Sequence, residues 1–382
     1  MYMKRVLIFS TAYHPFVGGA EVAIREITKR LQNDYAFDMI TARLDWRLPR
    51  IERVGAVNVH RIGFGIPIVD KLLLPFWGAI TALRLNAKNQ YLCFWGAMIT
   101  FASGAAYVSN LIHFWNKVHM VLTLQEGDSP AYIRKKWFGL LGLSWRLALM
   151  RTDALTVIST YLGKLAQSYG YKGAIEVVPN GADIMHFKGE SIVHNGTILI
   201  TTSRLAHKNA IDDVIRALPI LPDIRFQVLG TGPLNAELKT LAQKEGVQGR
   251  VEFLGHIDYA DIPRHLHAAD IFIRPSRSEG MGNSFIEAMA AGLPVIATQE
   301  GGIADFLFDE KRNPDKPTTG WAVDKNSPEQ IAEAVNDILA RPEKVREVVA
   351  TAKKMVSEKY DWDIIAHDMH KRVFQRLFAL RK

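Results

Sequence analysis

The sequence predicts an α/β fold in which two Rossmann-like domains face a central cleft. Short β-branched runs alternate with helical stretches along the chain, and this alternation begins again near residue 197. The length of 382 residues exceeds what one compact core usually holds. The composition is globular, with 48% hydrophobic and 23% charged residues. Strands that alternate with helices predict parallel sheets with both faces covered.

The first series of elements opens with KRVLIFSTAYHP, residues 4–15, which reads as a buried strand. A helix is expected over residues 18–32, because Val22, Ala23, Ile27 and Leu31 recur at helical spacing. Residues 91–115 lack acids, Lys and Arg over a membrane-spanning length. Small and polar residues interrupt this segment, so we expect a strand followed by a buried helix. The runs ALTVIS and AIEVVPNG, residues 154–159 and 174–181, are further short strands.

The second series begins with GTILITTSRL at residue 196 and continues through RFQVLGTGP, VEFLG, DIFIRPS and PVIAT. The polar, poorly periodic residues 183–196 mark the boundary, which gives domains 1–188 and 189–360. Residues 361–382 read as a basic amphipathic helix that is expected to pack back on the first domain. In such a pair of domains, the carboxyl-end loops of both sheets open into one cleft.

The positive charge is concentrated in the first half of the chain. Residues 1–190 hold 22 Lys/Arg against 13 Asp/Glu, and residues 191–382 hold 25 against 26. This asymmetry indicates either a solvated basic face or an acidic partner such as anionic lipid; we expect no nucleic-acid partner. The single cysteine, Cys93, suits a reducing compartment, and the N-terminus does not read as a signal peptide. We therefore expect a cytoplasmic protein.

Two acids flank a small, flexible run in SEGMGNSFIEAMAAG, residues 278–292. A helix is expected to begin near Asn283 at the carboxyl edge of a sheet, where free N–H groups favour phosphate. Gly280 and Gly282 permit close approach of a ligand to the backbone. Glu287 can accept hydrogen bonds from a ribose diol, and Glu279 faces the other side of a diphosphate. Alternatively, both acids only complement the helix N-terminus.

Two cations follow the first strand of the second domain. Arg204 and Lys208, in TTSRLAHKNAIDDVIRAL, are expected to point at the same crevice, where they would neutralise a diphosphate. Ordinary surface charge explains either cation alone. In the first domain, Gly18 and Gly19 lie between strand and helix, as close approach to a phosphate or sugar requires. The chain has neither the dinucleotide fingerprint G-x-G-x-x-G nor a P-loop motif.

Together these motifs resemble the family-4 retaining glycosyltransferases of the GT-B fold. The resemblance rests on EGMGNSFIEAMAAGLPVIAT, SRLAHKNAIDDVIRAL, VVPNGAD and PFVGGAEVAIREI, which occur in the family's order. It implies transfer of a sugar from a nucleotide diphosphate donor, UDP- or GDP-linked, to a saccharide or lipid-linked acceptor with retention of the anomeric configuration. It also implies a role in cell-surface polysaccharide or glycolipid synthesis.

By this resemblance, the catalytic residues are Glu279, Arg204 and Lys208: Glu279 holds the donor sugar, and the two cations bind the diphosphate. The donor-binding residues it implies are Gly18, Gly19, Gly282, Asn283, Ser284 and Glu287. Many relatives carry a histidine after the strand HMVLTL, whereas this chain reads QEGDSP. Gln125, Glu126 and Asp128 are therefore candidates for contact with the sugar or acceptor, and a solvated loop is the alternative.

Two further expectations concern partners and cofactors. Residues 71–85 and 132–151 mix large apolar residues with cations, which is typical both of helices on anionic membranes and of helices that cover a sheet. We expect no cofactor and no metal: residues 361–363, DWD, precede the last helix, where Asp361 suits an N-cap. The alternatives are a nucleotide-sugar epimerase of the same fold or a catalytically inactive relative that binds nucleotide-sugar.

Overall fold

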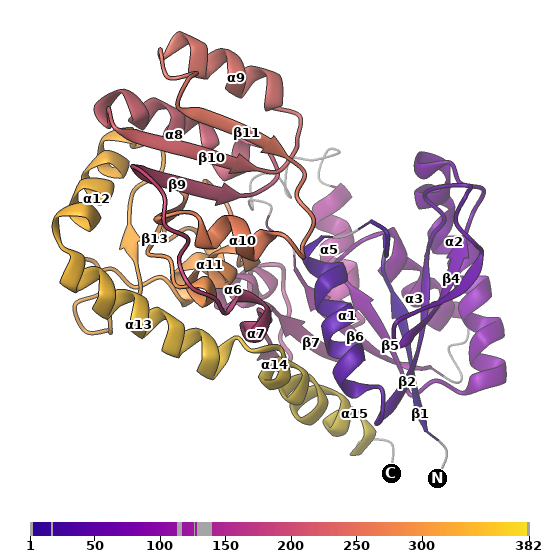
Figure 1. Ribbon diagram of the computed structural model, residues 1–382. Helices are drawn as coiled ribbons and strands as arrows, with labels where there is room; N and C mark the ends of the chain where they lie inside the picture. Colours follow the sequence, from indigo (N-terminus) through magenta and orange to yellow (C-terminus); the bar gives the residue numbers. More distant parts are fainter. Residues whose placement is uncertain (1–2, 17, 113–116, 126, 128–139, 380–382) are drawn as a thin grey trace. The chain divides into compact units, whose positions relative to one another are not determined.

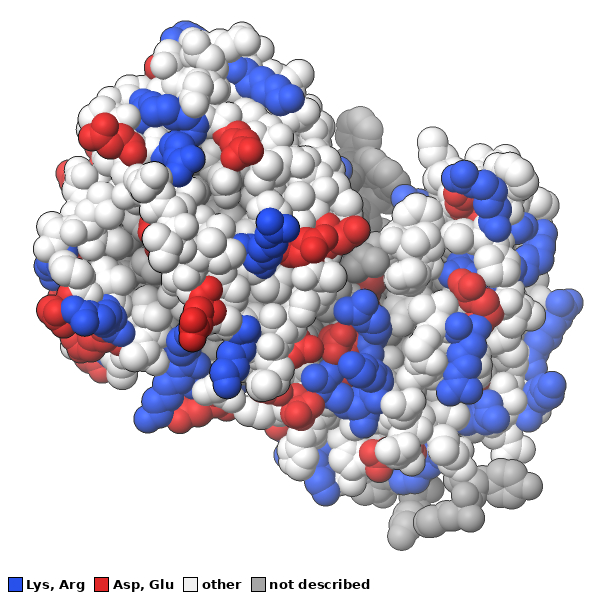
Figure 2. Space-filling view, in the orientation of Figure 1, with Lys and Arg blue, Asp and Glu red and all other residues white. Residues whose placement is uncertain are grey.

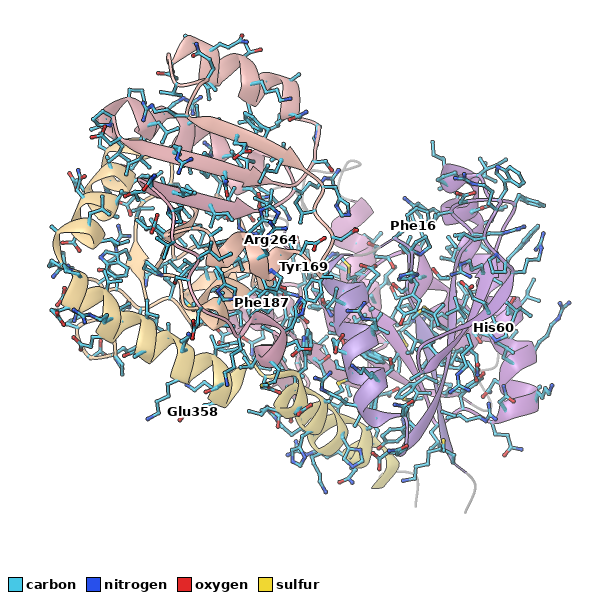
Figure 3. All side chains as sticks on the ribbon, in the orientation of Figure 1. Phe16, His60, Tyr169, Phe187, Arg264 and Glu358 are labelled. Carbon is cyan, nitrogen blue, oxygen red and sulfur yellow. The ribbon has the colours of Figure 1, made fainter. Side chains whose placement is uncertain are left out.

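The computed structural model describes residues 3–16, 18–112, 117–125, 127 and 140–379. The chain forms two compact units, residues 1–180 with 362–382 and residues 181–361 (Figure 1). The first unit therefore ends at Asn180, slightly before the boundary drawn from the sequence at residue 188. Phe187 explains the difference, because it is fully buried and packs edge-on against Tyr259 of the second unit (Figure 3).

The described residues of the first unit form an eight-stranded sheet in the order β3-β4-β2-β1-β5-β6-β7-β8. Every pair of neighbours is parallel except the hairpin of β3 and β4. The sheet is covered on both faces, and residues 6–9 of the central strand β1 are wholly inaccessible to solvent. The strands are β1 (Lys4–Phe9), β2 (Tyr35–Ala42), β3 (Ile51–Val54), β4 (Val57–Ile62), β5 (Cys93–Ala97), β6 (His119–Leu124), β7 (Ala154–Val157) and β8 (Ile175–Val177).

The helices of the first unit that precede residue 180 are α1 (Gly19–Leu31), α2 (Pro67–Asn89), α3 (Phe101–Ile112), α5 (Leu140–Met150) and α6 (Thr160–Ser168). The predicted strand and small-residue helix within 91–115 are confirmed as β5 and α3. Ala102, Ala105 and Ala106 let α3 pack closely on α2 and the sheet. In the part of the chain that the structure describes, no helix combines the length and apolarity needed to cross a membrane.

The C-terminal segment consists of α14 (Trp362–Asp368), a π-helical turn (Met369–Phe374) and α15 (Gln375–Ala379). It belongs to the first unit and runs beside α1 (Figure 1). Trp362 is buried in the same core cluster as Ile27 of α1. Arg372 also binds Glu176 of β8 at 2.7 Å. The last helical segment therefore completes the core of the first unit.

The second unit contains a parallel sheet, with six strands among the described residues in the order β11-β10-β9-β12-β13-β14. The predicted strands of this half are confirmed. The strands are β9 (Thr197–Thr202), β10 (Ile224–Leu229), β11 (Val251–Gly255), β12 (Ile271–Arg274), β13 (Val295–Ala297) and β14 (Trp321–Ala322). The fold class predicted from the sequence, two α/β units built on parallel sheets, is thus confirmed.

Helices pack on this sheet, and several of them share one hydrophobic core cluster with β9, β10 and β12. They are α7 (Ile184–Phe187), α8 (Ile211–Ala217), α9 (Asn235–Lys244), α10 (Ile262–His267), α11 (Asn283–Ala291), α12 (Pro328–Ala340) and α13 (Pro342–Lys359). Shorter 3-10 turns cover His207–Asn209, Leu218–Ile220 and Gly301–Asp305.

Candidate donor site

The three residues predicted to be catalytic lie on two loops that leave the same edge of the sheet of the second unit. Strands β9 and β12 are parallel neighbours, so both loops emerge at their carboxyl ends. The loop after β9 carries Arg204 and Lys208, and the loop after β12 carries Glu279. The amide of Arg277 donates a hydrogen bond to the Lys208 carbonyl oxygen at 2.7 Å. A backbone hydrogen bond therefore joins the loop that carries the two cations to the loop that carries Glu279.

The side chain of Arg277 reinforces the link between these loops. Its guanidinium donates to the His207 carbonyl oxygen at 2.9 Å and to Asp212 and Asp213 at 2.8 Å. Burial acts to raise the pKa of Asp212, but hydrogen bonds from Arg277 and Arg216 outweigh it and lower that pKa. Burial raises the pKa of Asp213, and the neighbouring Asp212 adds to the effect.

The two predicted cations differ in exposure. Arg204 is exposed, and Lys208 is partly buried in the 3-10 turn His207–Asn209. The turn is held by Asn209, whose side-chain amide donates to the Arg204 carbonyl oxygen at 2.6 Å. Neither cation forms an ion pair with a residue that the structure describes. Both positive charges therefore remain available to an anionic ligand.

Glu279 is held on both carboxylate oxygens. Its Oε2 accepts a hydrogen bond from Arg274 at 2.7 Å, and its Oε1 accepts one from the Gly280 amide at 3.0 Å. Arg274 is the last residue of β12, and it also donates to the Ser284 hydroxyl at 2.9 Å. Its guanidinium lies over the Phe285 ring, 4.2 Å from the centroid. These contacts connect the acid, the strand end and the first turn of α11.

The helix α11 begins where the sequence predicted, at Asn283, with Gly282 as N-cap. Gly282 has a φ of +87°, a conformation that disfavours a side chain. Glu287 follows about one turn later and retains a little solvent exposure. Burial raises its pKa to about 7, and the nearby charge of Arg274 acts in the opposite direction. This carboxyl group therefore changes charge near neutral pH.

The predicted residues of the first unit lie at its own carboxyl-end loops. Gly18 is the N-cap of α1, and its amide donates to the Glu21 carboxylate at 2.9 Å, while Gly19 is the first helical residue. Gln125 follows β6 and accepts a hydrogen bond from the Asn180 side chain at 3.1 Å. Glu126 and Asp128 lie outside the described residues.

Sequence reasoning missed Arg274 and Arg277. Both occur in DIFIRPSRSEG, which predicted only a strand and a loop. The available signal was an arginine that ends an otherwise apolar buried strand. Such a charge needs a carboxylate partner, and Glu279 follows within the same loop.

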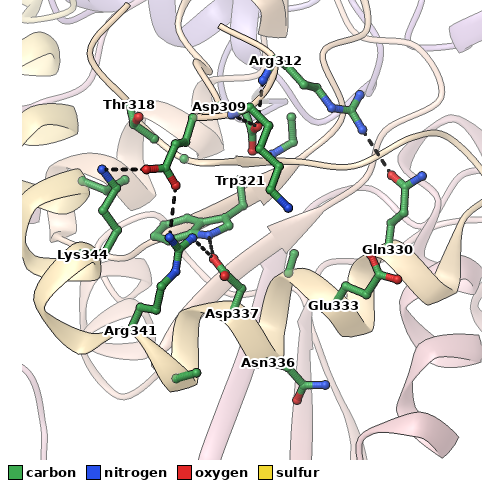
Figure 4. A pocket seen from close by; sticks show the side chains of 17 residues that line it. Asp309, Arg312, Thr318, Trp321, Gln330, Glu333, Asn336, Asp337, Arg341 and Lys344 are labelled. Carbon is green, nitrogen blue, oxygen red and sulfur yellow. Dashed lines mark hydrogen bonds and ion pairs between the residues drawn. The ribbon is translucent and has the colours of Figure 1, made fainter. Parts of the chain in front are cut away.

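A cavity of about 680 Å³ lies elsewhere in the second unit, between β14, α12 and α13 (Figure 4). None of the predicted site residues that the structure describes lines it. Several of its charged groups bind one another: Arg341 pairs with Glu310 and Asp337, and Asp337 also accepts a hydrogen bond from the Trp321 indole at 2.7 Å. This ion-pair network ties the edge strand to two helices. The charge of Arg341 is therefore already neutralised, unlike those of Arg204 and Lys208.

The described residues contain no group of three or more His, Cys, Asp or Glu side chains placed to hold a metal ion.

Family models match both halves of the chain. Residues 17–186 match the model described as Glycosyltransferase Family 4, and residues 183–355 match Glycosyl transferases group 1. The GDP-mannose-dependent α-(1-6)-phosphatidylinositol monomannoside mannosyltransferases of Mycobacterium tuberculosis and Mycolicibacterium smegmatis are 28% and 29% identical, over 56% and 57% of this chain. The match covers only 60% and 62% of those relatives' own lengths.

Matches along nearly the whole chain come from other proteins. An uncharacterized glycosyltransferase of Methanocaldococcus jannaschii is 24% identical over 95% of this chain and 96% of its own. Sucrose-phosphate synthase from Thermosynechococcus elongatus superposes with a TM-score of 0.85 at 21% identity, over 99% of this chain and 100% of its own. The Anabaena protein HepE, solved with UDP and glucose, gives a TM-score of 0.75 at 19% identity, over 97% and 99% of the two chains. The two family models and the shared fold show that this chain belongs to the GT-B-fold glycosyltransferases.

Proposed function

We propose that this glycosyltransferase moves a sugar from a UDP- or GDP-linked donor to a saccharide or lipid-linked acceptor, with retention of the anomeric configuration. The observation that carries the proposal is the hydrogen bond from Arg277 to Lys208, which joins the cation-bearing and acid-bearing loops at one sheet edge. A nucleotide-sugar offers the matching groups, namely a diphosphate, a ribose diol and sugar hydroxyls. In line with this, the mycobacterial relatives are named as GDP-mannose-dependent, and HepE was solved with UDP-glucose.

Each residue has one role in the proposed reaction. Arg204 and Lys208 bind the diphosphate and stabilise the charge that develops as it leaves. Glu287 accepts hydrogen bonds from the ribose diol, while Glu279 accepts them from the donor sugar. Asn283 and Ser284 present the N-terminal amides of α11 to the phosphates. In the first unit, Gly18 and Gly19 approach the donor with their backbone.

The bond from the anomeric carbon to the phosphate oxygen breaks, and a bond to the acceptor oxygen forms on the same face. The acceptor proton passes to the departing phosphate oxygen, so the balance requires neither a protein nucleophile nor a metal. Gln125, Glu126 and Asp128 are proposed to contact the sugar or the acceptor hydroxyl.

The acceptor side of the proposal includes a membrane surface on the cytoplasmic side. Helix α2 leaves a broad apolar surface in solvent, with Ile68 75% and Phe76 63% exposed. We call this surface the α2 apolar face; it comprises Ile68, Val69, Leu72, Phe76, Trp77 and Ile80. Lys71, Arg84 and Lys88 flank it, and side chains over this part of Figure 2 are mainly uncharged or basic. Apolar residues flanked by cations are typical of helices that bind anionic lipid.

Nucleotide binding tests the donor part directly. A nucleotide at about 100 times its dissociation constant should add roughly 2.7 kcal/mol to the free energy of unfolding. We expect UDP or GDP to raise the melting temperature, and Glu287→Ala to weaken that effect. A transfer assay with the preferred donor, read by NMR at the new anomeric centre, should show retention. Stabilisation by neither nucleotide, or a product of inverted configuration, would contradict the proposal; binding without transfer would indicate an inactive relative.

A further inference from the structure

Arg274 places a positive charge inside the second unit, directly beneath the predicted donor site. Its side chain is almost fully buried, with 6% of the residue exposed. Burial lowers the pKa of this arginine, whereas Glu279 and Glu287 act to raise it. Because guanidinium groups do not lose their proton in proteins, the charge persists and requires compensation. The two acids assigned to the donor site supply it.

The surroundings of Arg274 leave space for its guanidinium in one orientation. A Cβ atom at position 282 would lie 2.4 Å from Nη2, so the glycine there leaves room for the side chain. The Phe285 ring covers one face of the guanidinium, and the Ser284 hydroxyl accepts from Nη1. Planar stacking and divergent hydrogen bonds are properties of arginine that lysine does not share.

The contact with Glu279 determines which carboxylate sites remain for a ligand. A carboxylate has about four lone-pair sites. Arg274 and the Gly280 amide occupy one on each oxygen, so both oxygens keep a site for sugar hydroxyls. A side chain held in place before binding loses little further freedom when the ligand arrives.

We propose that Arg274 is the positioning residue for the donor sugar. This inference rests on the proposed function, because it assumes that Glu279 receives the sugar. Arg274 acts through Glu279, to which it donates a hydrogen bond, and does not touch the donor. Its replacement should therefore weaken the binding and positioning of the donor sugar. Binding of the nucleoside diphosphate depends instead on Arg204, Lys208 and Glu287.

The test compares Arg274→Met and Arg274→Lys with Arg250→Met as control. Arg250 lies just before β11, at the opposite edge of the same sheet, where its guanidinium binds the carbonyl oxygens of Leu218, Leu221 and Ile224. Its loss destabilises the same unit without reaching the donor site. Calorimetry with UDP and UDP-glucose, and with GDP and GDP-mannose, measures the two halves of the ligand separately. Hydrolysis of the bound nucleotide-sugar measures turnover without a known acceptor.

We expect Arg274→Met to leave the affinity for the nucleoside diphosphate within about threefold, and turnover to fall at least about tenfold, since small displacements in a reacting geometry reduce rates strongly. The extra affinity contributed by the sugar should also disappear. Arg274→Lys should recover only part of both losses. The effects of Arg274→Met and Glu279→Gln should not add in the double variant, because one residue acts through the other.

Equal weakening of nucleoside diphosphate and nucleotide-sugar by Arg274→Met, or additive effects with Glu279→Gln, would overturn the positioning role and leave the proposed function intact. The same loss of turnover in Arg250→Met would also overturn it, as it would point to general destabilisation. If the wild type binds neither UDP nor GDP, the proposed function fails, and this inference fails with it.

Discussion

The amide nitrogen of Arg277 lies 2.7 Å from the carbonyl oxygen of Lys208, and this hydrogen bond joins the loops after β9 and β12. The same arginine binds two aspartates of α8 through its side chain. The loop geometry therefore depends on a residue that is not itself assigned to the ligand.

Replacing Arg277 by alanine should destabilise the second unit and weaken nucleotide binding. Asp213, with a side chain only 3% exposed, would keep its ion pair with Arg216, at 3.2 Å. Leaving a buried carboxylate poorly paired costs about 2–4 kcal/mol. The affinity for UDP or GDP should fall several-fold, since the turn at His207 loses a contact. Urea unfolding and calorimetry measure both effects.

The control for Arg277→Ala is Arg216→Ala, which removes the more exposed cation of the same network. An exposed ion pair contributes roughly 1 kcal/mol or less, so this variant should be near wild type in stability and affinity. Equal losses in the two variants would mean that the link between the loops has no special role.

Gly282→Ala should be more destabilising than the same change at a glycine with open surroundings. Both Gly282 and Gly246 have positive φ, at +87° and +69°. A Cβ at 282 meets Arg274 at 2.4 Å and Phe285 at 2.7 Å, whereas one at 246 has no atom within 4 Å. Backbone strain accounts for about 1 kcal/mol in both variants. Urea unfolding measures the loss of stability in each variant. A larger loss in Gly282→Ala would show that packing around Arg274 stabilises the fold, and equal losses would exclude that contribution.

The strands of the second unit were predictable because apolar runs with clear turn residues surround each of them. β12 is an example: Ile271, Phe272 and Ile273 are fully buried, and Pro275 follows. Sequence could not reveal where Arg274 points, because the direction of a side chain at a strand end depends on groups brought together by folding. Asp38 on β2 shows the same limit, since its partners Asn58 and Tyr91 are distant in the chain.

The positions of the candidate site residues at strand ends were predictable from the sequence, whereas the contacts between their loops were less so. Two recognisable motifs that come after strands contain Lys208, Glu279 and Glu287. The link between their loops runs through Arg277, whose side chain binds Asp212 and Asp213 of α8, and no spacing in the sequence indicates these pairs. Local spacing reports which residues share a loop, while contacts between loops depend on strand order.

Glu287 should make the stability of the second unit depend on pH. The folded state raises its pKa from 4.5 to about 7, so the folded state binds the proton more tightly than the unfolded state. This contribution to stability is fully present below pH 4.5 and is lost as the pH rises to about 7; the total is about 3 kcal/mol. Glu287→Gln should remove this term. Its melting temperature without nucleotide should therefore exceed that of the wild type more at pH 8 than at pH 5, and a constant difference would contradict the assignment.

The α2 apolar face should bind anionic vesicles. Asp70, the acid of this helix, is buried, and its carboxylate accepts hydrogen bonds from the amides of Phe64, Gly65 and Ile66. The solvent side of α2 therefore presents apolar groups and cations, to which a membrane of anionic lipid is complementary. We expect co-sedimentation with vesicles containing phosphatidylglycerol, and less with pure phosphatidylcholine.

Introducing a charge into this face tests that expectation. Phe76→Asp should abolish co-sedimentation, because it places an acid in the apolar face and repels anionic lipid. Val193→Asp is the matched control: Val193 is 98% exposed and belongs to the second unit, so the same type of change occurs outside the α2 apolar face. Vesicle binding that survives Phe76→Asp, or that Val193→Asp reduces equally, would remove α2 as the membrane contact. The wild type could instead self-associate as its concentration rises and not bind vesicles. If Phe76→Asp abolished that self-association, the α2 apolar face would be assigned to contact with a second copy of the chain.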